Sequence, residues 1–211
     1  MGKTRKGLRY RPKDEYFNRA KKEGFVARSA FKLEEMDQRW KFFKPGMKIL
    51  DIGCAPGSWL QYASHKVGPK GHLVGFDIDP VKLSIPNVET HVMSLYDVSP
   101  ETSFIKPWLP FDMIQSDAMV KTVGIAESDV ARSIALVEAS LSLAESGLLK
   151  VGGHFVAKVF EGPGFSDFYV GFKRKFKRNY VSKPEAVREG SREVYIVGLE
   201  YKGVPLPKAP A

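Results

Sequence analysis

The chain has little cysteine, no long apolar run and no pattern of metal ligands. Cys54 is the sole cysteine among 211 residues, which excludes an intramolecular disulfide and a zinc site built from cysteines. The four histidines show no metal-ligand spacing, so we assign no metal. No segment approaches the roughly 18 consecutive apolar residues that a membrane span requires. No apolar stretch follows the basic N-terminus, so we expect a cytoplasmic protein without a signal peptide.

Acidic residues are scarce toward both ends of the chain. Lys and Arg outnumber Asp and Glu by 33 to 24, which gives a net charge of +9. Residues 1–50 hold 15 basic against 6 acidic side chains, and residues 166–211 hold 10 against 5, whereas residues 51–165 hold 8 against 13. Basic flanks attract polyanions through long-range Coulomb forces. Charge alone leaves RNA, DNA and anionic lipid as alternatives.

The chain length fits one domain between two short flanking segments. Residues 1–13 carry six basic and no acidic side chains, which predicts a flexible basic arm. We expect a single domain over residues 14–200 and a loose proline-rich tail over residues 201–211. Phosphate contacts are expected in the arm and near the end of the domain, at Arg9, Arg11, Lys13, Lys173, Arg174, Lys175, Lys177 and Arg178.

Hydrophobic periodicity predicts strands that alternate with helices. We expect strands at 47–51, 71–77, 88–93, 111–116, 154–160, near Tyr180 and at 193–199. Helices are expected at 14–22, 29–40, 58–67, about 130–148 and 165–176. Ser29 is the expected N-cap of the second helix, and Gly152-Gly153 the expected end of the fourth. The alternation predicts an α/β fold with one mostly parallel, seven-stranded, Rossmann-like sheet and helices on both faces.

A glycine-bearing loop, Asp51-Ile-Gly-Cys-Ala-Pro-Gly57, follows the first predicted strand. Glycine lets the backbone approach a ligand closely. The Gly-x-x-x-Gly spacing, interrupted by Pro56, argues against the Gly-x-Gly-x-x-Gly loop of nicotinamide cofactors. Asp77 ends the second strand, where its carboxylate can accept hydrogen bonds from ribose hydroxyls. The loop and Asp77 together favour an adenosine-containing cofactor, and Cys54 is interpreted as a small residue under the loop, not a nucleophile.

Longer segments carry a more specific pattern. They are Arg28-Ser-Ala-Phe-Lys-Leu33, Phe43-Lys-Pro-Gly-Met-Lys-Ile-Leu-Asp-Ile-Gly-Cys-Ala-Pro-Gly-Ser-Trp59, Ser116-Asp117, Phe155-Val-Ala-Lys-Val-Phe-Glu-Gly-Pro-Gly-Phe165 and Ser191-Arg-Glu-Val-Tyr-Ile-Val197. In this order they closely resemble the FtsJ/RrmJ family of RNA ribose 2′-O-methyltransferases, over about residues 14–200. The resemblance implies S-adenosylmethionine as the cofactor and RNA as the substrate.

The resemblance also implies the residues of the site. The family's catalytic Lys-Asp-Lys-Glu tetrad is matched here by Lys32, Asp117, Lys158 and Glu193. The expected cofactor-binding residues are Asp51, Gly53, Ala55, Pro56, Gly57, Trp59, Asp77, Asp97 and Asp117. Lys158 is the candidate general base, and Lys32 nearby would favour loss of its proton by like-charge repulsion. Asp117 and Glu193 act in the opposite direction, so stabilisation of an alkoxide by Lys158 is the alternative.

The chain departs from the family pattern at two places. The family usually follows its catalytic Asp with Met-Ala-Pro-Asn, whereas residues 118–124 read Ala-Met-Val-Lys-Thr-Val-Gly. Ser94 stands where an acid is expected near the adenine, and Asp97 follows three residues later. The chain resembles bacterial-type members of this size without an extra domain, and this resemblance implies a nucleotide of large-subunit ribosomal RNA, a uridine, as the target. A tRNA anticodon loop and an inactive RNA-binding role remain the alternatives.

Overall fold

The computed structural model describes residues 13–120 and 122–204. Its strands are β1 (Lys48–Ile52), β2 (His72–Asp77), β3 (Val88–Val92), β4 (Phe111–Ser116), β5 (Leu149–Phe160), β6 (Phe176–Ser182) and β7 (Glu193–Tyr201). Its helices are α1 (Lys13–Glu23), α2 (Ala30–Trp40), α3 (Ser58–Val67), α4 (Ala126–Leu143) and α5 (Phe165–Lys175), with short helical turns η1 (Leu95–Asp97) and η2 (Lys106–Trp108). Arg9, Arg11 and most of the predicted arm and tail lie outside the described residues, so those domain boundaries stay predictions.

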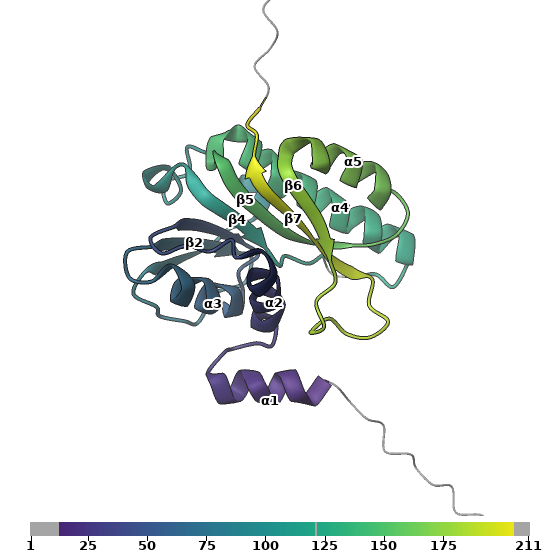
Figure 1. Ribbon diagram of the computed structural model, residues 1–211, viewed down its shortest axis with the longest axis horizontal. Coiled ribbons are helices and arrows are strands. Elements are labelled where there is room, and N and C mark those ends of the chain that lie inside the picture. The colour runs from purple at the N-terminus through teal and green to yellow at the C-terminus, as the bar shows by residue number, and fades with distance from the viewer. Residues whose placement is uncertain (1–12, 121, 205–211) are drawn as a thin grey trace, which may run out of the picture.

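The seven strands form one sheet in the order β3-β2-β1-β4-β5-β7-β6. β7 runs antiparallel to β5 and β6, and the other neighbouring strands are parallel. Helices α4 and α5 cover one face of the sheet, and α2 and α3 cover the other (Figure 1). This architecture confirms the predicted mostly parallel sheet with helices on both faces.

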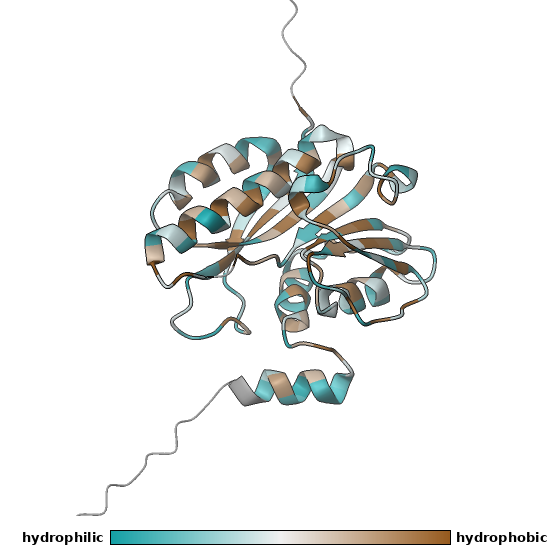
Figure 2. Cartoon of the chain, turned by 180° about the vertical axis from the view of Figure 1, so that it is seen from behind, coloured by the Kyte–Doolittle hydropathy of each residue, from teal (hydrophilic) through white to brown (hydrophobic). Residues whose placement is uncertain are grey.

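The core lies on both faces of the sheet because successive strand residues point in opposite directions. In β1, Leu50 belongs to the apolar cluster under α4 and α5, whereas Ile49 belongs to the cluster under α2 and α3. Both side chains are fully buried. Figure 2 shows the resulting concentration of hydrophobic residues along the strands. Among the residues that the structure describes, every helix is too short or too polar to cross a membrane.

Helix α1 packs at one end of the molecule, outside the two helical layers (Figure 1). Ala20 and Tyr16 of α1 contact Phe31 of α2, and Ala186 of the β6–β7 loop joins the same small cluster. The Arg19 guanidinium lies 4.0 Å from the Phe31 ring centroid. These contacts hold α1 beside α2 and the β6–β7 loop.

One local prediction was confirmed in part and another was wrong. Ser29 is the N-cap residue of α2, as predicted, but its side chain caps no backbone N–H and its Oγ lies 2.7 Å from Ser58 Oγ. The long helix passes into a five-residue turn over 144–148, in which Gly147 adopts a φ of 103°. Glycine alone adopts such a φ without strain, so the helix ends there. Gly152-Gly153 therefore lies inside β5 and does not end the helix.

Candidate active site

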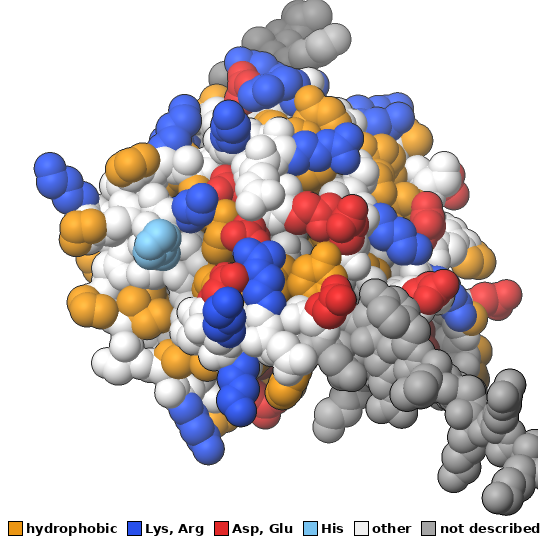
Figure 3. Space-filling view, turned by 60° about the horizontal axis from the view of Figure 1, so that its bottom comes forward, with side chains coloured by type: hydrophobic (Ala, Val, Ile, Leu, Met, Phe, Trp, Pro, Cys, Tyr) orange, Lys and Arg blue, Asp and Glu red, His pale blue; other side chains and the backbone are white. Residues whose placement is uncertain are grey.

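The predicted site residues converge where β1, β4 and β5 end and β7 begins. The strand order reverses between β1 and β4. Open parallel sheets bind ligands at such a switch point, outside the carboxyl ends of the strands. Figure 3 looks onto this end of the molecule, where acidic and basic side chains lie close together.

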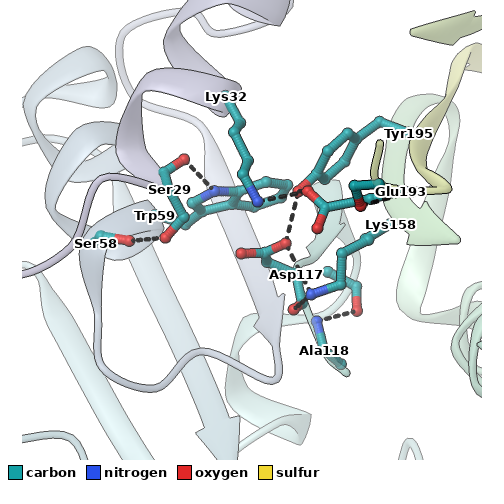
Figure 4. A network of polar contacts seen from close by, with 11 residues as sticks. Ser29, Lys32, Ser58, Trp59, Asp117, Ala118, Lys158, Glu193 and Tyr195 are labelled. Carbon is teal, nitrogen blue, oxygen red and sulfur yellow. Dashed lines mark hydrogen bonds and ion pairs between the residues drawn. The ribbon is translucent and has the colours of Figure 1, made fainter. Parts of the chain in front are cut away.

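The structure brings together all four residues of the predicted charged tetrad, Lys32, Asp117, Lys158 and Glu193 (Figure 4). Lys32 Nζ on α2 donates to Glu193 Oε1 at 2.5 Å. Lys158 Nζ on β5 donates to the main-chain oxygen of Asp117 at 2.6 Å and lies 3.2 Å from its Oδ1. Both lysines are only 8% exposed, and a buried charge is costly unless it is paired. Each lysine therefore has its own carboxylate, and the formal charges of the tetrad cancel.

Tyr195 joins the tetrad and was missed by the sequence analysis. Its hydroxyl oxygen lies 2.8 Å from Asp117 Oδ1 and 2.8 Å from Glu193 Oε1. Burial, followed by the two carboxylates, raises the pKa of Tyr195 well above its ordinary value, so the phenol keeps its proton. With one O–H, Tyr195 donates to one carboxylate at a time. The available signal was the spacing, because residues two apart in a strand share a face.

Replacing Tyr195 with phenylalanine is expected to destabilise the fold by about 1.5–3 kcal/mol, the usual range for hydrogen bonds to charged groups. The change leaves Asp117 and Glu193 without the donor that separates them. Tyr201→Phe is the matched control, because the Tyr201 hydroxyl is buried without a partner among the described residues. Its removal should be neutral or slightly stabilising. Urea unfolding of both variants measures the difference, and equal losses would contradict a specific role for Tyr195.

Trp59 connects three elements around the tetrad. Its indole N–H donates to the main-chain oxygen of Ser29 at 2.9 Å. Its ring centroid lies 5.7 Å from that of Tyr195, and the side chain is 2% exposed. Trp59 therefore holds α3 against the start of α2 and against β7. Its predicted contact with the cofactor stays a prediction.

The glycines of the loop after β1 serve close packing. Gly53 has a φ of 71°, and a Cβ there would lie 2.4 Å from Ala118 Cβ. Gly57 has a φ of 110°, and a Cβ there would lie 2.4 Å from Leu83 Cδ1. From the sequence, these glycines were expected to allow close approach of a ligand. The structure adds that they let the loop contact the segments that follow β4 and β2.

Asp77 ends β2 and faces the same loop. Its Oδ2 accepts the Ala55 backbone N–H at 2.9 Å, and its Oδ1 accepts the Asp79 backbone N–H at 3.0 Å. Each carboxylate oxygen keeps a second lone-pair site. The carboxylate is thus held in place and can still accept from ribose hydroxyls. Pro56 is exposed in the loop and Asp97 is exposed in η1 at the same edge of the sheet, and their cofactor contacts stay predictions.

Asp51 and Cys54 lie beneath the loop. Asp51 is fully buried and accepts from Gln115 Nε2 at 3.0 Å. Burial raises the pKa of Asp51 well above its ordinary value, which favours the neutral carboxyl. Burial also raises the pKa of the Cys54 thiol, so Cys54 stays protonated and unreactive. Its predicted role as a small buried residue agrees with this position.

Large apolar side chains are exposed at the same end of the strands as the tetrad. Ile78 is 68% exposed after β2, Tyr96 is 71% exposed after β3, and Met119 is 62% exposed after β4. Exposed apolar surface beside a polar site is typical of ligand contact. Asp129 holds the loop that contains Met119, because its carboxylate accepts the Val123 backbone N–H at 2.8 Å.

The residues at 173–178 that were predicted to contact phosphate lie far from the tetrad. Lys175 pairs with Glu145, and Arg178 pairs with Glu200 at 2.7 Å. In the sheet, Arg178 lies opposite Leu199, near the end of β7. Because β7 is antiparallel to β5, this is the edge where β5 begins, whereas Lys158 lies near the end of β5.

Comparison with known proteins identifies the family of this chain. Residues 25–201 match the model of the FtsJ-like methyltransferase family. The chain belongs to this family. As an FtsJ-like methyltransferase it uses S-adenosylmethionine as its methyl donor. The glycine loop and Asp77 lie at the carboxyl ends of the strands, where open parallel sheets bind ligands.

Relatives of this FtsJ-like methyltransferase cover most of its length. Ribosomal RNA large subunit methyltransferase E of Bdellovibrio bacteriovorus is 42% identical over 92% of the chain and all of the relative. The protein of the same name from Desulfatibacillum aliphaticivorans is 44% identical over 90% of the chain and 92% of the relative. A solved structure described as a ribosomal RNA methyltransferase from Plasmodium falciparum matches with a TM-score of 0.73 and 26% identity, over 85% of this chain and all of that one.

Proposed function

We propose that this protein transfers a methyl group from S-adenosylmethionine to a ribose 2′-hydroxyl of large-subunit ribosomal RNA, and that the accepting nucleotide is a uridine. The observation that carries the proposal is the convergence of two buried lysine–carboxylate pairs and Tyr195 beside the cofactor loop. The names of the bacterial relatives support the choice of RNA. We also propose a cytoplasmic location, where such a substrate would be found.

The cofactor-binding part of the site comprises the segment after β1 and the carboxylate that ends β2. Gly53, Ala55, Pro56 and Gly57 would surround the cofactor, and Asp77 would accept from its ribose hydroxyls. S-adenosylmethionine supplies an electrophilic methyl group there. Ile78 and Tyr96 offer apolar surface to its base, next to Asp97. Asp117, Trp59 and Asp51 would hold or support the amino-acid end.

Lys158 acts on the substrate hydroxyl in this proposal. An amine nitrogen has three positions besides its carbon, and Asp117 occupies two of those on Lys158. The third position is free for the ribose oxygen. In its neutral form Lys158 accepts the hydroxyl proton there as the oxygen forms its bond to the methyl group. Tyr195 keeps Asp117 in place through its hydroxyl, and Lys32 compensates the charge of Glu193.

The test identifies the methylated product. The protein is incubated with labelled S-adenosylmethionine and, separately, with unmethylated large ribosomal subunits, naked large-subunit RNA or bulk tRNA. The RNA is digested and the labelled nucleosides are identified, with Lys158→Ala as the inactive control. We expect a 2′-O-methyluridine from ribosomal RNA alone.

The other outcomes decide against the proposal in distinct ways. A labelled product from tRNA alone would assign the activity to the anticodon loop. Cofactor binding without transfer to any of the three pools would favour an inactive RNA-binding protein. A base-methylated nucleoside would overturn the ribose assignment.

A further inference from the structure

A second concave site lies at the edge of the sheet opposite to the tetrad. It is a cavity of about 420 Å³ between the α2–β1 loop, the starts of β4, β5 and β6, and the end of β7. In Figure 1 this is the end where the yellow strand β7 finishes, away from α1. From His154 at the cavity to Lys158 in the tetrad is four residues of β5, or about 13 Å. The two sites therefore open on opposite edges of one sheet.

The cavity carries a surplus of positive charge. Its lining residues include four cations, Lys41, Lys44, Lys150 and Arg178, against two anions, Asp112 and Glu200. Both anions are already engaged: Asp112 pairs with Lys150, and Glu200 pairs with Arg178 at 2.7 Å. The ammonium groups of Lys41 and Lys44 are exposed and have no acidic partner among the described residues. The cavity thus offers two uncompensated positive charges to an anion.

His154 adds a directed hydrogen-bond donor to the wall of the cavity. Its Nδ1 accepts the Glu200 backbone N–H at 3.3 Å, so the proton of the neutral ring lies on Nε2. His154 itself lines the cavity. Burial, the largest effect, lowers the pKa of His154, and Lys44 and Arg178 act in the same direction, while a hydrogen bond to the Gly153 backbone and the charge of Glu200 raise it. The neutral ring therefore presents an N–H to the cavity beside the lysines.

Positive charge continues beyond the cavity along the same edge. Lys177 Nζ lies 3.4 Å from Glu200 Oε2. Lys202 Nζ donates to the main-chain oxygen of Arg174 at 3.1 Å, which places both residues next to the end of β7. A single small anion needs only the cavity. A band of cations wider than one phosphate fits a polymer of phosphates.

We propose that this cavity binds a backbone phosphate of the RNA substrate, in a segment remote from the methylated nucleotide, through Lys41, Lys44 and the Nε2–H of His154. The inference rests on the proposed function for the identity of the RNA. Because the two sites face opposite edges, a short hairpin that fills the active site does not reach the cavity. A large folded RNA reaches both.

The first measurement compares two substrates with the variant Lys41→Gln/Lys44→Gln. One substrate is full-length large-subunit RNA, and the other is a short hairpin that carries the methylated nucleotide. We expect the KM for the full-length RNA to rise about five- to tenfold, with kcat and the KM for the hairpin unchanged. For the full-length RNA, the slope of log KM against the logarithm of the salt concentration should decrease by about one to two, which corresponds to the loss of one to two phosphate contacts. Lys70→Gln/Lys106→Gln, at two other exposed lysines, is the control for the loss of two positive charges, one of which, on Lys106, is paired with Glu101.

The second measurement reads the cavity without any RNA. Inorganic phosphate is titrated into the protein, and the ring resonances of His154 are followed by NMR at several pH values. Phosphate in the cavity should shift these resonances and raise the pKa of His154, because a nearby anion favours the charged ring. The Lys41→Gln/Lys44→Gln variant should lose this response. If the proposed function fails, no RNA is methylated, yet the phosphate response of His154 remains readable.

Three results would overturn the inference. An equal rise in KM for the control variant would show that only overall charge matters. A phosphate response of His154 without any change in KM for the full-length RNA would assign the cavity to a free anion. An effect seen with ribosomal subunits but absent with naked RNA would assign it to a ribosomal protein.

Discussion

The variant Lys158→Met is expected to lose methyl transfer by about 10²- to 10⁴-fold in kcat, the usual contribution of a positioned proton acceptor. Methionine fills a similar volume but has no nitrogen to take the hydroxyl proton. It also removes the partner of Asp117, whose carboxylate lies 3.2 Å from the ammonium. Single-turnover methylation of ribosomal RNA at saturating cofactor measures the loss.

Lys158→Arg separates the two possible roles of Lys158. A guanidinium keeps the positive charge but stays protonated, so it does not act as a base. An arginine variant as inactive as the methionine variant supports proton acceptance. Activity within tenfold of the wild type would instead assign Lys158 to stabilisation of an alkoxide. Calorimetric binding of S-adenosylmethionine, unchanged in both variants, shows that the site remains folded.

The variant Gly53→Ala is expected to lower the free energy of unfolding by about 2–4 kcal/mol, from the positive φ and a collision together. A Cβ at Gly53 would lie 2.4 Å from Ala118 Cβ and 2.5 Å from Ala118 Cα. Backbone atoms must then move, and Ala118 directly follows Asp117. We therefore also expect cofactor affinity to fall at least tenfold, as measured by calorimetry.

Gly46→Ala is the matched control for this prediction. Gly46 has a φ of 83°, but a Cβ there would meet no atom within 4 Å. Its alanine variant thus carries only the conformational cost of a positive φ, about 1–2 kcal/mol. The difference between the unfolding free energies of the two variants, measured by heat or urea, gives the cost of the collision alone. Equal destabilisation, with cofactor binding intact in both, would contradict the close packing of the loop on the segment after β4.

Much of the fold could be read from local patterns in the sequence. Helix α3 was predicted at residues 58–67 and β4 at residues 111–116, and the structure has both at those bounds. Such elements can be predicted because the spacing of apolar residues along a short segment indicates whether it is a helix or a strand. The helix end at Gly147 was missed because the helical spacing of the apolar residues Leu141, Ala144 and Leu148 continues past it. Whether the helix ends at Gly147 or at Gly152 depends on where the chain must turn toward β5.

The tetrad was identified through its resemblance to a family, and without it Lys32 and Glu193 would have looked like ordinary surface charges. Their side chains meet across 161 residues of sequence. The same holds for Tyr195, whose spacing from Glu193 indicates a shared strand face but not what that face contacts. The partner of a buried charge is set by packing between elements, which periodicity does not describe.

The sequence by itself determined the class of fold, the glycine loop with Asp77, and the residue types of the site, because each is written in local pattern or in short motifs. Only the tertiary structure decided which groups meet. The insertion of β7, antiparallel between β5 and β6, brings Glu193 and Tyr195 beside Asp117. The same antiparallel path carries Arg178 and Glu200 to the opposite edge, beside His154. Strand order and direction are collective properties of the sheet, so they separate charges that lie close in sequence and join others that lie far apart.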